Sequence, residues 1–317
     1  MRTEFLRPRT AGHSPLPSIR EIGLLADVTL RKSQAGRVTA VFDSSFYAVF
    51  GGEWICVGLP HIGSGPLHVV CESRPHAWPQ SENAITLDGF ALSLDGMPFA
   101  TLEGASVWQP ERLEDWTLAD LQRGVGAASA LWRGEPSGSG LAAAGCVPFP
   151  AGLSRLMSAA RPAVAALDRI LAQACAGCDA SPEDEMLLIT LIGLGPGLTP
   201  SGDDLLGGAL IALASLDLLD VRDRLWSVCS DKLDRTTDIS ALHLRTAARG
   251  YGAASLHDAI HATIGGDVSR LPDFLNAVST IGHSSGRDSY AGALIALRAA
   301  ERHFSREDTR TWGSAEA

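Results

Sequence analysis

The chain has 317 residues, a formal net charge of −10 and 45% hydrophobic residues. This length is enough for one large domain or two ordinary ones with a sizeable core. No basic run stands out, so the electrostatic footprint of a nucleic-acid-binding protein is missing. No apolar run reaches the length of a membrane span, and the basic N-terminal residues lack the apolar segment of a secretory signal. Six scattered cysteines fit reduced thiols, so we expect a cytoplasmic protein.

The first half of the chain has the pattern of short β-strands. Runs rich in apolar, β-branched and aromatic residues, bounded by turn residues, occupy 37–50, 54–58, 67–71, 85–87, 91–94 and 101–108. The pairs Asp88-Gly89 and Asp95-Gly96 fall between such runs, and an Asp-Gly pair favours a hairpin because both residues tolerate positive φ. Short strands at this spacing predict an antiparallel sandwich or a barrel-like domain.

The second half of the chain has helical periodicity. Apolar residues recur at three- and four-residue intervals over 113–132, 153–174, 183–191, 203–218, 221–233, 239–249, 253–264, 271–281 and 287–303. The predicted fold class is therefore α+β, a β-rich N-terminal domain followed by a mostly α-helical C-terminal domain. The predicted divisions are a flexible arm at 1–20, a β-rich domain with a trailing helix at 21–133, a linker at 134–150, a helical domain at 151–305 and a tail at 306–317.

One loop-to-helix sequence occurs twice. SGDDLLGGALIAL begins at Ser201, and SGRDSYAGALIAL begins 84 residues later at Ser285. On a purely structural interpretation, Ser-x-x-Asp is a capping box whose serine accepts a hydrogen bond from a first-turn N–H. The small residues Gly208 and Gly292 would let another helix approach closely. An internal duplication is one explanation of the match.

The first copy follows an unusual stretch, GLGPG at 193–197. Glycines at alternate positions expose backbone N–H groups beside a helix N-terminus, an arrangement that binds anions. The stretch is not a P-loop, because no lysine follows the last glycine, and its G-x-G-x-G spacing does not fit a dinucleotide-binding fingerprint. Asp203 and Asp204 would repel a bare phosphate. Either a cation such as Mg²⁺ at Asp203 and Asp204 bridges the ligand, or the ligand binds higher on the loop.

Three segments together resemble the successive motifs of the AllH-like family: GLGPGLTPSGDDLLGG, TTDISALHLRTAARG and IGHSSGRDSYAGALIAL, within residues 193–297. The named member of this family is a subunit of oxamate carbamoyltransferase in anaerobic allantoin breakdown. The resemblance implies interconversion of oxalurate plus phosphate with oxamate plus carbamoyl phosphate, together with AllG-like and FdrA-like partner subunits. Two alternatives stay open, a non-catalytic anion-binding or assembly subunit and a stand-alone carbamoyl- or acyl-phosphate transferase or hydrolase.

Carbamoyl transfer needs donors for a phosphate and for a carbonyl oxygen, and an acid or base for the amide nitrogen. We expect both repeated helix N-termini to converge on one site that supplies them. The candidate substrate-binding residues are Gly195, Gly197, Leu198, Thr199, Ser201, Gly202, Asp203, Ser284, Ser285, Gly286 and Arg287. The candidate catalytic residues are His283, Asp204 and Asp288, with His283 as general acid or base, although a backbone-bonded loop histidine is an equal alternative. Arg287 would clamp a carboxylate with two parallel hydrogen bonds.

Two other motifs have structural interpretations. His257 and His261 have the spacing of the zincin motif, but aspartate replaces its glutamate and no third ligand is evident, so a surface or packing pair is favoured. Thr236 and Thr237, ahead of Asp238, are predicted to cap the next helix.

Overall fold

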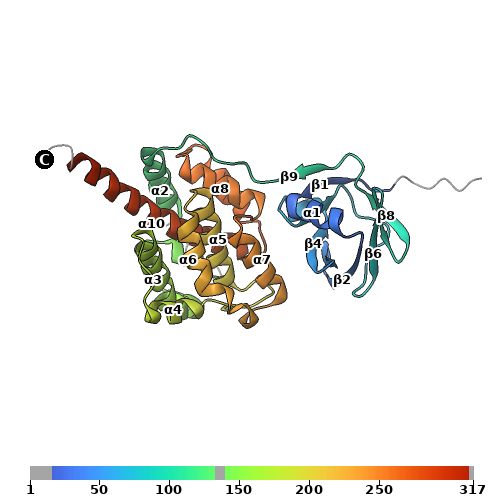
Figure 1. The fold of residues 1–317 in the computed structure, drawn as a ribbon, viewed down its shortest axis with the longest axis horizontal. Coiled ribbons are helices and arrows are strands. Elements are labelled where there is room, and N and C mark those ends of the chain that lie inside the picture. Colours follow the sequence, from blue (N-terminus) through green and yellow to red (C-terminus); the bar gives the residue numbers. More distant parts are fainter. Residues whose placement is uncertain (1–15, 133–139, 314–317) are drawn as a thin grey trace, which may run out of the picture. The chain divides into compact units, whose positions relative to one another are not determined.

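The computed structural model describes residues 16–132 and 140–313, and these residues form two compact units (Figure 1). The β unit contains residues 16–62 and 67–108, and the helical unit contains residues 63–66 and 109–313. The predicted fold class, a β-rich N-terminal part followed by a mostly helical C-terminal part, is confirmed. Most of the expected arm and residues 134–139 of the expected linker lie outside the described residues. No helix among the described residues is long and apolar enough to cross a membrane.

The β unit is one curled sheet. Its strands are β1 (Ile19–Gly23), β2 (Ala35–Val41), β3 (Ser45–Phe50), β4 (Glu53–Gly58), β5 (His68–Cys71), β6 (Ala84–Asp88), β7 (Ala91–Leu94), β8 (Met97–Thr101) and β9 (Ser106–Trp108). The strand order is β8-β7-β6-β2-β3-β4-β5-β1-β9, and only the β4–β5 and β1–β9 pairs are parallel among the described strands. A parallel bridge between Ser18 and Thr101 brings the start of β1 to the end of β8, which curls the sheet.

Alternation along the strands explains the core of the β unit. In β3, Phe46, Ala48 and Phe50 are buried, and the residues between them are partly exposed. Both Asp-Gly turns form, with positive φ at Gly89, Asp95 and Gly96. The run 37–50, predicted as one strand, is two strands, because the chain turns where the N–H of Phe42 donates to the carbonyl of Ser45. The sequence pattern also did not show the short helix α1 (Leu24–Lys32), which packs against β1 and β4.

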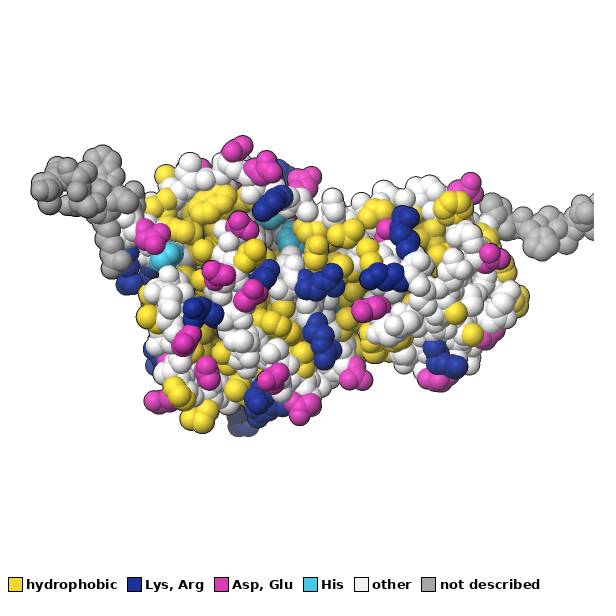
Figure 2. Space-filling view, viewed as in Figure 1, with side chains coloured by type: hydrophobic (Ala, Val, Ile, Leu, Met, Phe, Trp, Pro, Cys, Tyr) yellow, Lys and Arg dark blue, Asp and Glu magenta, His cyan; other side chains and the backbone are white. Residues whose placement is uncertain are grey.

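The helical unit agrees closely with the predicted periodic segments. Its helices are α2 (Leu118–Trp132), α3 (Arg155–Cys175), α4 (Pro182–Ile189), α5 (Ser201–Ser215), α6 (Leu219–Ser230), α7 (Asp238–Ala248), α8 (Ala254–Ile264), α9 (Leu271–Val278) and α10 (Ser285–Gly313). Short 3₁₀ turns lie at Pro60–Ile62, Ala142–Gly145 and Leu233–Arg235. Figure 1 shows the C-terminal part of α10 extending past the other helices of this unit. Figure 2 shows acidic and basic side chains interspersed on the visible face.

The two copies of the repeated motif pack against each other at the centre of the helical unit. Gly208 of α5 lies against the backbone of Ser289, and Gly292 of α10 lies against the backbone of Leu205. Leu205 and Ser289 occupy equivalent positions in the two motifs, as do the two glycines. The contact is therefore reciprocal. Glycine lets the two helix backbones approach closely, as the stripe of small residues predicted.

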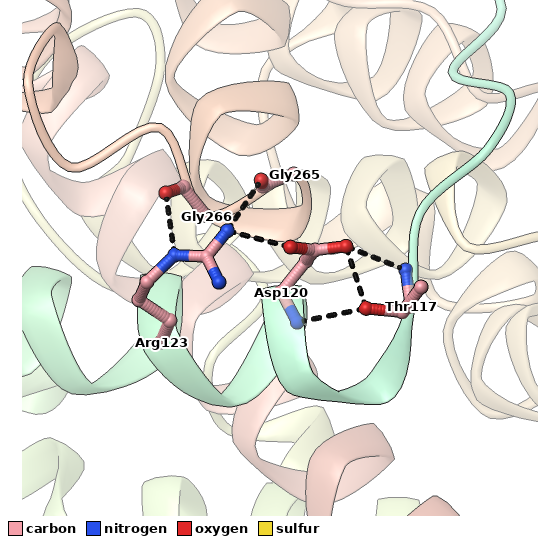
Figure 3. Close-up of polar contacts among 5 residues, drawn as sticks. All are labelled: Thr117, Asp120, Arg123, Gly265 and Gly266. Carbon is pink, nitrogen blue, oxygen red and sulfur yellow. Dashed lines mark hydrogen bonds and ion pairs between the residues drawn. The ribbon is translucent and has the colours of Figure 1, made fainter.

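Side-chain capping fixes the helices around this pair. Thr117 and Asp120 form a reciprocal cap at the start of α2, where the Thr117 hydroxyl accepts from the Asp120 N–H and Asp120 accepts from the Thr117 N–H (Figure 3). Arg123, one turn further, donates to Asp120 at 2.5 Å and to the carbonyl of Gly266 at 3.1 Å, just past the end of α8. A guanidinium at a helix C-terminus satisfies otherwise unpaired carbonyls and complements the helix dipole.

Candidate functional site

The glycine-rich loop, residues 193–200, enters α5 in a conformation that only glycine adopts easily. Gly193, Gly195 and Gly197 have φ of +76°, +125° and +95°. A Cβ on Gly195 would lie 2.8 Å from the backbone nitrogen of Ser201, the first residue of α5. The glycines therefore hold the loop close over the helix N-terminus.

Most N–H groups of this loop have no acceptor in the part of the chain that the structure describes. The N–H of Gly193 donates to Asp203 at 2.9 Å, and that of Leu194 donates to the carbonyl of Leu191. Among the described residues, no acceptor is found for the N–H groups of Gly195, Gly197, Leu198, Thr199 and Ser201. Leu198 is 48% exposed, so this part of the loop faces solvent. The donors that the sequence predicted for an anion are thus not taken by the protein itself.

Asp203 anchors the first end of the loop. Its carboxylate accepts from the N–H of Gly193 and from the hydroxyls of Thr236 and Ser240, the last at 2.7 Å. Burial raises the pKa of Asp203, and these three donors oppose that shift. Asp203 therefore fastens the loop to the beginning of α7 and is occupied by protein donors.

The start of α7 also holds the other end of the loop. Thr237 is the N-cap of α7, where its hydroxyl accepts from the N–H of Ser240 at 3.0 Å, which confirms the predicted cap. The same hydroxyl donates to the carbonyl of Leu198. The N-terminus of α7 is therefore a third helix start beside the loop, which the repeated motif alone did not reveal, although the Thr-Thr-Asp sequence marked a cap.

The N-termini of α5 and α10 converge, as predicted. The hydroxyls of Thr199, which precedes α5, and Ser285, which opens α10, lie 2.9 Å apart. The positive ends of two helix dipoles thus face one small region. This contact joins the first repeated loop directly to the second.

The capping-box interpretation is wrong for α5, whose N-cap is Pro200 without a side-chain hydrogen bond. The serines and aspartates pair across the two helices instead. Ser285 of α10 lies close enough to Asp204 of α5 for its hydroxyl to lower the pKa of that carboxyl, and Ser201 of α5 does the same for Asp288 of α10. Because α5 and α10 cross reciprocally, each helix supplies the partner that the other one's aspartate needs.

Burial affects the carboxyl groups of both Asp204 and Asp288. Asp288 is fully buried and accepts from the N–H of Leu141 at 2.6 Å. Burial is the largest cause that raises the pKa of each group, and for Asp204, whose pKa lies well above its ordinary value, the charges of Asp288 and Asp203 add to it. The Oδ2 atom of each is buried and has no hydrogen-bond partner among the described residues.

The two neighbouring aspartates of the first motif face different surroundings. Asp203 is turned toward Thr236 and Ser240, and Asp204 interacts with Ser285. Among the described residues, no group of three or more histidine, cysteine, aspartate or glutamate side chains is placed to hold a metal ion. A cation at Asp203 and Asp204 therefore stays a prediction.

The remaining residues of the second loop have separate environments. His283 is exposed, and Ser284 hydrogen-bonds Asp288. The guanidinium carbon of Arg287 lies 5.5 Å from the ring centroid of Trp132, a cation–π contact. The N–H groups of Gly202 and Gly286 donate to backbone carbonyls, so these two glycines serve close packing rather than donation to a ligand.

Two features lie away from this site. His257 is buried and its Nε2 accepts from the N–H of Gly252 at 3.1 Å, which confirms the packing interpretation for this histidine. Burial lowers its pKa to about 3. Cavities of about 310 and 380 Å³ lie near Cys175 and His303, the first between α3 and α10 and the second also bounded by the start of α6.

No solved structure matches the chain. One family model does match, and its match lies wholly in the helical unit, from the glycine-rich loop to the middle of α10. The family's description names a subunit of a carbamoyltransferase, hence a component of a multi-subunit transferase. Residues 191–297, which contain both repeated motifs and the start of α7, match the family of oxamate carbamoyltransferase subunit AllH and confirm the resemblance that the motifs predicted.

Proposed function

We propose that the chain is a subunit of an oxamate carbamoyltransferase-like enzyme and binds an anionic metabolite at the glycine-rich loop. The reaction would interconvert oxalurate plus phosphate with oxamate plus carbamoyl phosphate in the cytoplasm, together with AllG-like and FdrA-like subunits. The family match over 191–297 supports the class of enzyme. The substrate and the role of each residue are proposals.

One observation carries the binding proposal. The loop and the first residue of α5 have N–H groups for which the described residues offer no acceptor, at Gly195, Gly197, Leu198, Thr199 and Ser201. They lie where the N-termini of α5, α7 and α10 come together. Helix N-termini and unpaired amides favour negative charge, and a loop that presents both can bind a carboxylate or phosphate without a lysine. This explains how a chain of net charge −10 can hold an anion with local donors.

The same donors suit the chemistry of carbamoyl transfer. Attack on a carbamoyl carbon builds negative charge on its oxygen, and preorganised N–H groups stabilise such charge. Exposed His283 is a candidate to move a proton at the amide nitrogen. Arg287, stacked on Trp132, is a candidate for the carboxylate of oxamate.

The burial of Asp288 favours a second candidate function. Asp288 is fully buried under the backbone of Gly140 and Leu141, so it cannot touch a ligand in this conformation. A subunit that binds or carries the anion while a partner supplies the acid–base groups fits this burial.

The assay that separates the two functions measures carbamoyl phosphate formed from oxalurate and phosphate. The chain is tested alone and then with AllG-like and FdrA-like subunits, and oxamate binding to the chain alone is measured beside it.

The Gly197→Ala variant tests the loop directly. Gly197 has φ of +95° and open space around it, so an added methyl group strains the backbone without a steric clash. We expect oxamate binding, measured by calorimetry, to weaken at least about tenfold, because the misplacement of several donors costs more than about 1.4 kcal/mol.

Gly152→Ala is the matched control, since Gly152 also has positive φ, +75°, and open space but lies before α3, away from the loop. It should bind oxamate as the parent chain does. Equal affinity of the Gly197→Ala variant and the parent chain would remove the loop from the binding site.

A further inference from the structure

Asp204 and Asp288 are related by the crossing of α5 and α10. Each is the fourth residue of its repeated motif, and each lies near the hydroxyl of the first residue of the other motif. This reciprocal arrangement places two acidic groups at the point where two positive helix ends meet. Each keeps one buried carboxyl oxygen that has no partner among the described residues.

An orphaned buried carboxylate oxygen is costly, and the cost is removed when the group takes up a proton. The groups described around the pair do not supply a cation for it. Asp203 on α5 adds negative charge, α7 offers only hydroxyls to Asp203, the Gly140–Leu141 segment offers a backbone N–H, and Arg287 on α10 stacks on Trp132. Two like charges that share such a site titrate as a coupled pair.

We propose that Asp204 and Asp288 act together as a proton-holding pair behind the glycine-rich loop, so that the site takes up a proton when it binds an anion. The proton leaves solvent and forms an O–H bond on one carboxylate of the pair. A negative charge at the converging helix N-termini favours this protonated form. This inference rests on the proposed anion site, and it assigns the two aspartates a role that does not require contact with the ligand.

Calorimetry of oxamate binding in buffers of different ionisation enthalpy tests the coupling. We expect net proton uptake, and an affinity that falls as pH rises, by at most about tenfold per pH unit for one proton. Asp204→Asn should abolish the uptake while oxamate still binds. The matched control is Asp258→Asn on α8, another acid whose pKa burial raises, and it should leave the uptake unchanged.

An infrared difference spectrum, oxamate-bound minus unliganded, tests the pair independently of the heat of binding. At neutral pH oxamate binding should increase the C=O stretch of a protonated carboxylic acid in the parent chain, and Asp204→Asn or Asp288→Asn should diminish this increase whereas Asp258→Asn retains it. Oxamate binding without proton uptake, or a spectrum in which the Asn variants change nothing, overturns this inference and leaves the proposed function standing. A parent chain that binds no oxamate overturns the anion site instead.

Discussion

Gly208→Ala and Gly292→Ala are each expected to destabilise the chain strongly. A methyl group on Gly208 would overlap the carbonyl of Ser289, and one on Gly292 would overlap the carbonyl of Leu205. The atoms that each methyl group would overlap belong to the backbone at a buried helix crossing, so they cannot move aside as a flexible side chain could. We expect each variant to lose about 3 kcal/mol of unfolding free energy in denaturant titration, at the upper end of overpacking costs, despite the better helix propensity of alanine.

The adjacent glycine supplies the control for this prediction. A methyl group on Gly207 would lie 3.6 Å from the Cβ of Ala247, an ordinary van der Waals contact. Gly207→Ala should therefore be neutral or stabilising by up to about 1 kcal/mol, because alanine has the better helix propensity. Similar unfolding curves for the Gly207→Ala and Gly208→Ala variants would contradict the close crossing of α5 and α10.

Asp203→Asn is expected to cost both stability and binding. The carboxylate of Asp203 accepts three hydrogen bonds, and a side-chain amide would place an N–H₂ donor against hydroxyl and N–H donors. Charged hydrogen bonds in a buried place are worth about 1.5–3 kcal/mol each, and the desolvation of the carboxylate offsets part of that gain. We expect a loss of about 3 kcal/mol in unfolding free energy.

A binding measurement distinguishes a role of Asp203 in positioning the loop from a role in stability alone. Because Asp203 fixes Gly193 and thereby the loop, Asp203→Asn should also weaken oxamate binding in the folded chain. Ser240→Ala removes one of the three donors and should cost only about 1 kcal/mol, with little effect on binding. If Asp203→Asn binds oxamate as tightly as the parent chain, then Asp203 does not position the loop.

Stability against pH provides an independent check on the acidic pair. The pKa values of Asp204 and Asp288 are raised above the ordinary 3.8 on folding, so between 3.8 and the raised values the folded chain binds more protons than the unfolded chain. Unfolding free energy contributed by the pair is therefore present at low pH and is lost as pH rises through the folded pKa values. The Asp204→Asn variant should show a shallower decline over this range in unfolding titrations.

The sequence by itself determined the fold class, the positions of the helices and the presence of a loop suited to anions. These rest on local properties: apolar residues at helical spacing, Asp-Gly turns, and the glycines at 193, 195 and 197, which have positive φ in the structure. The repeated Ser-x-x-Asp sequence likewise located two helix starts. Periodicity is reliable for such features because backbone preference and burial act within a few neighbouring residues.

Only the tertiary structure decided which groups meet. From the sequence, Ser201 and Asp204 looked like partners in one cap, but reciprocal packing of α5 on α10 brings Ser201 to Asp288 and Asp204 to Ser285, each a residue of the other motif. The third helix start, at Thr237, joins the loop by a single hydroxyl, which no spacing in the sequence encodes. Such contacts depend on where glycine lets two backbones approach. Helix crossing, rather than local preference, therefore fixed the surroundings of Asp203, Asp204 and Asp288.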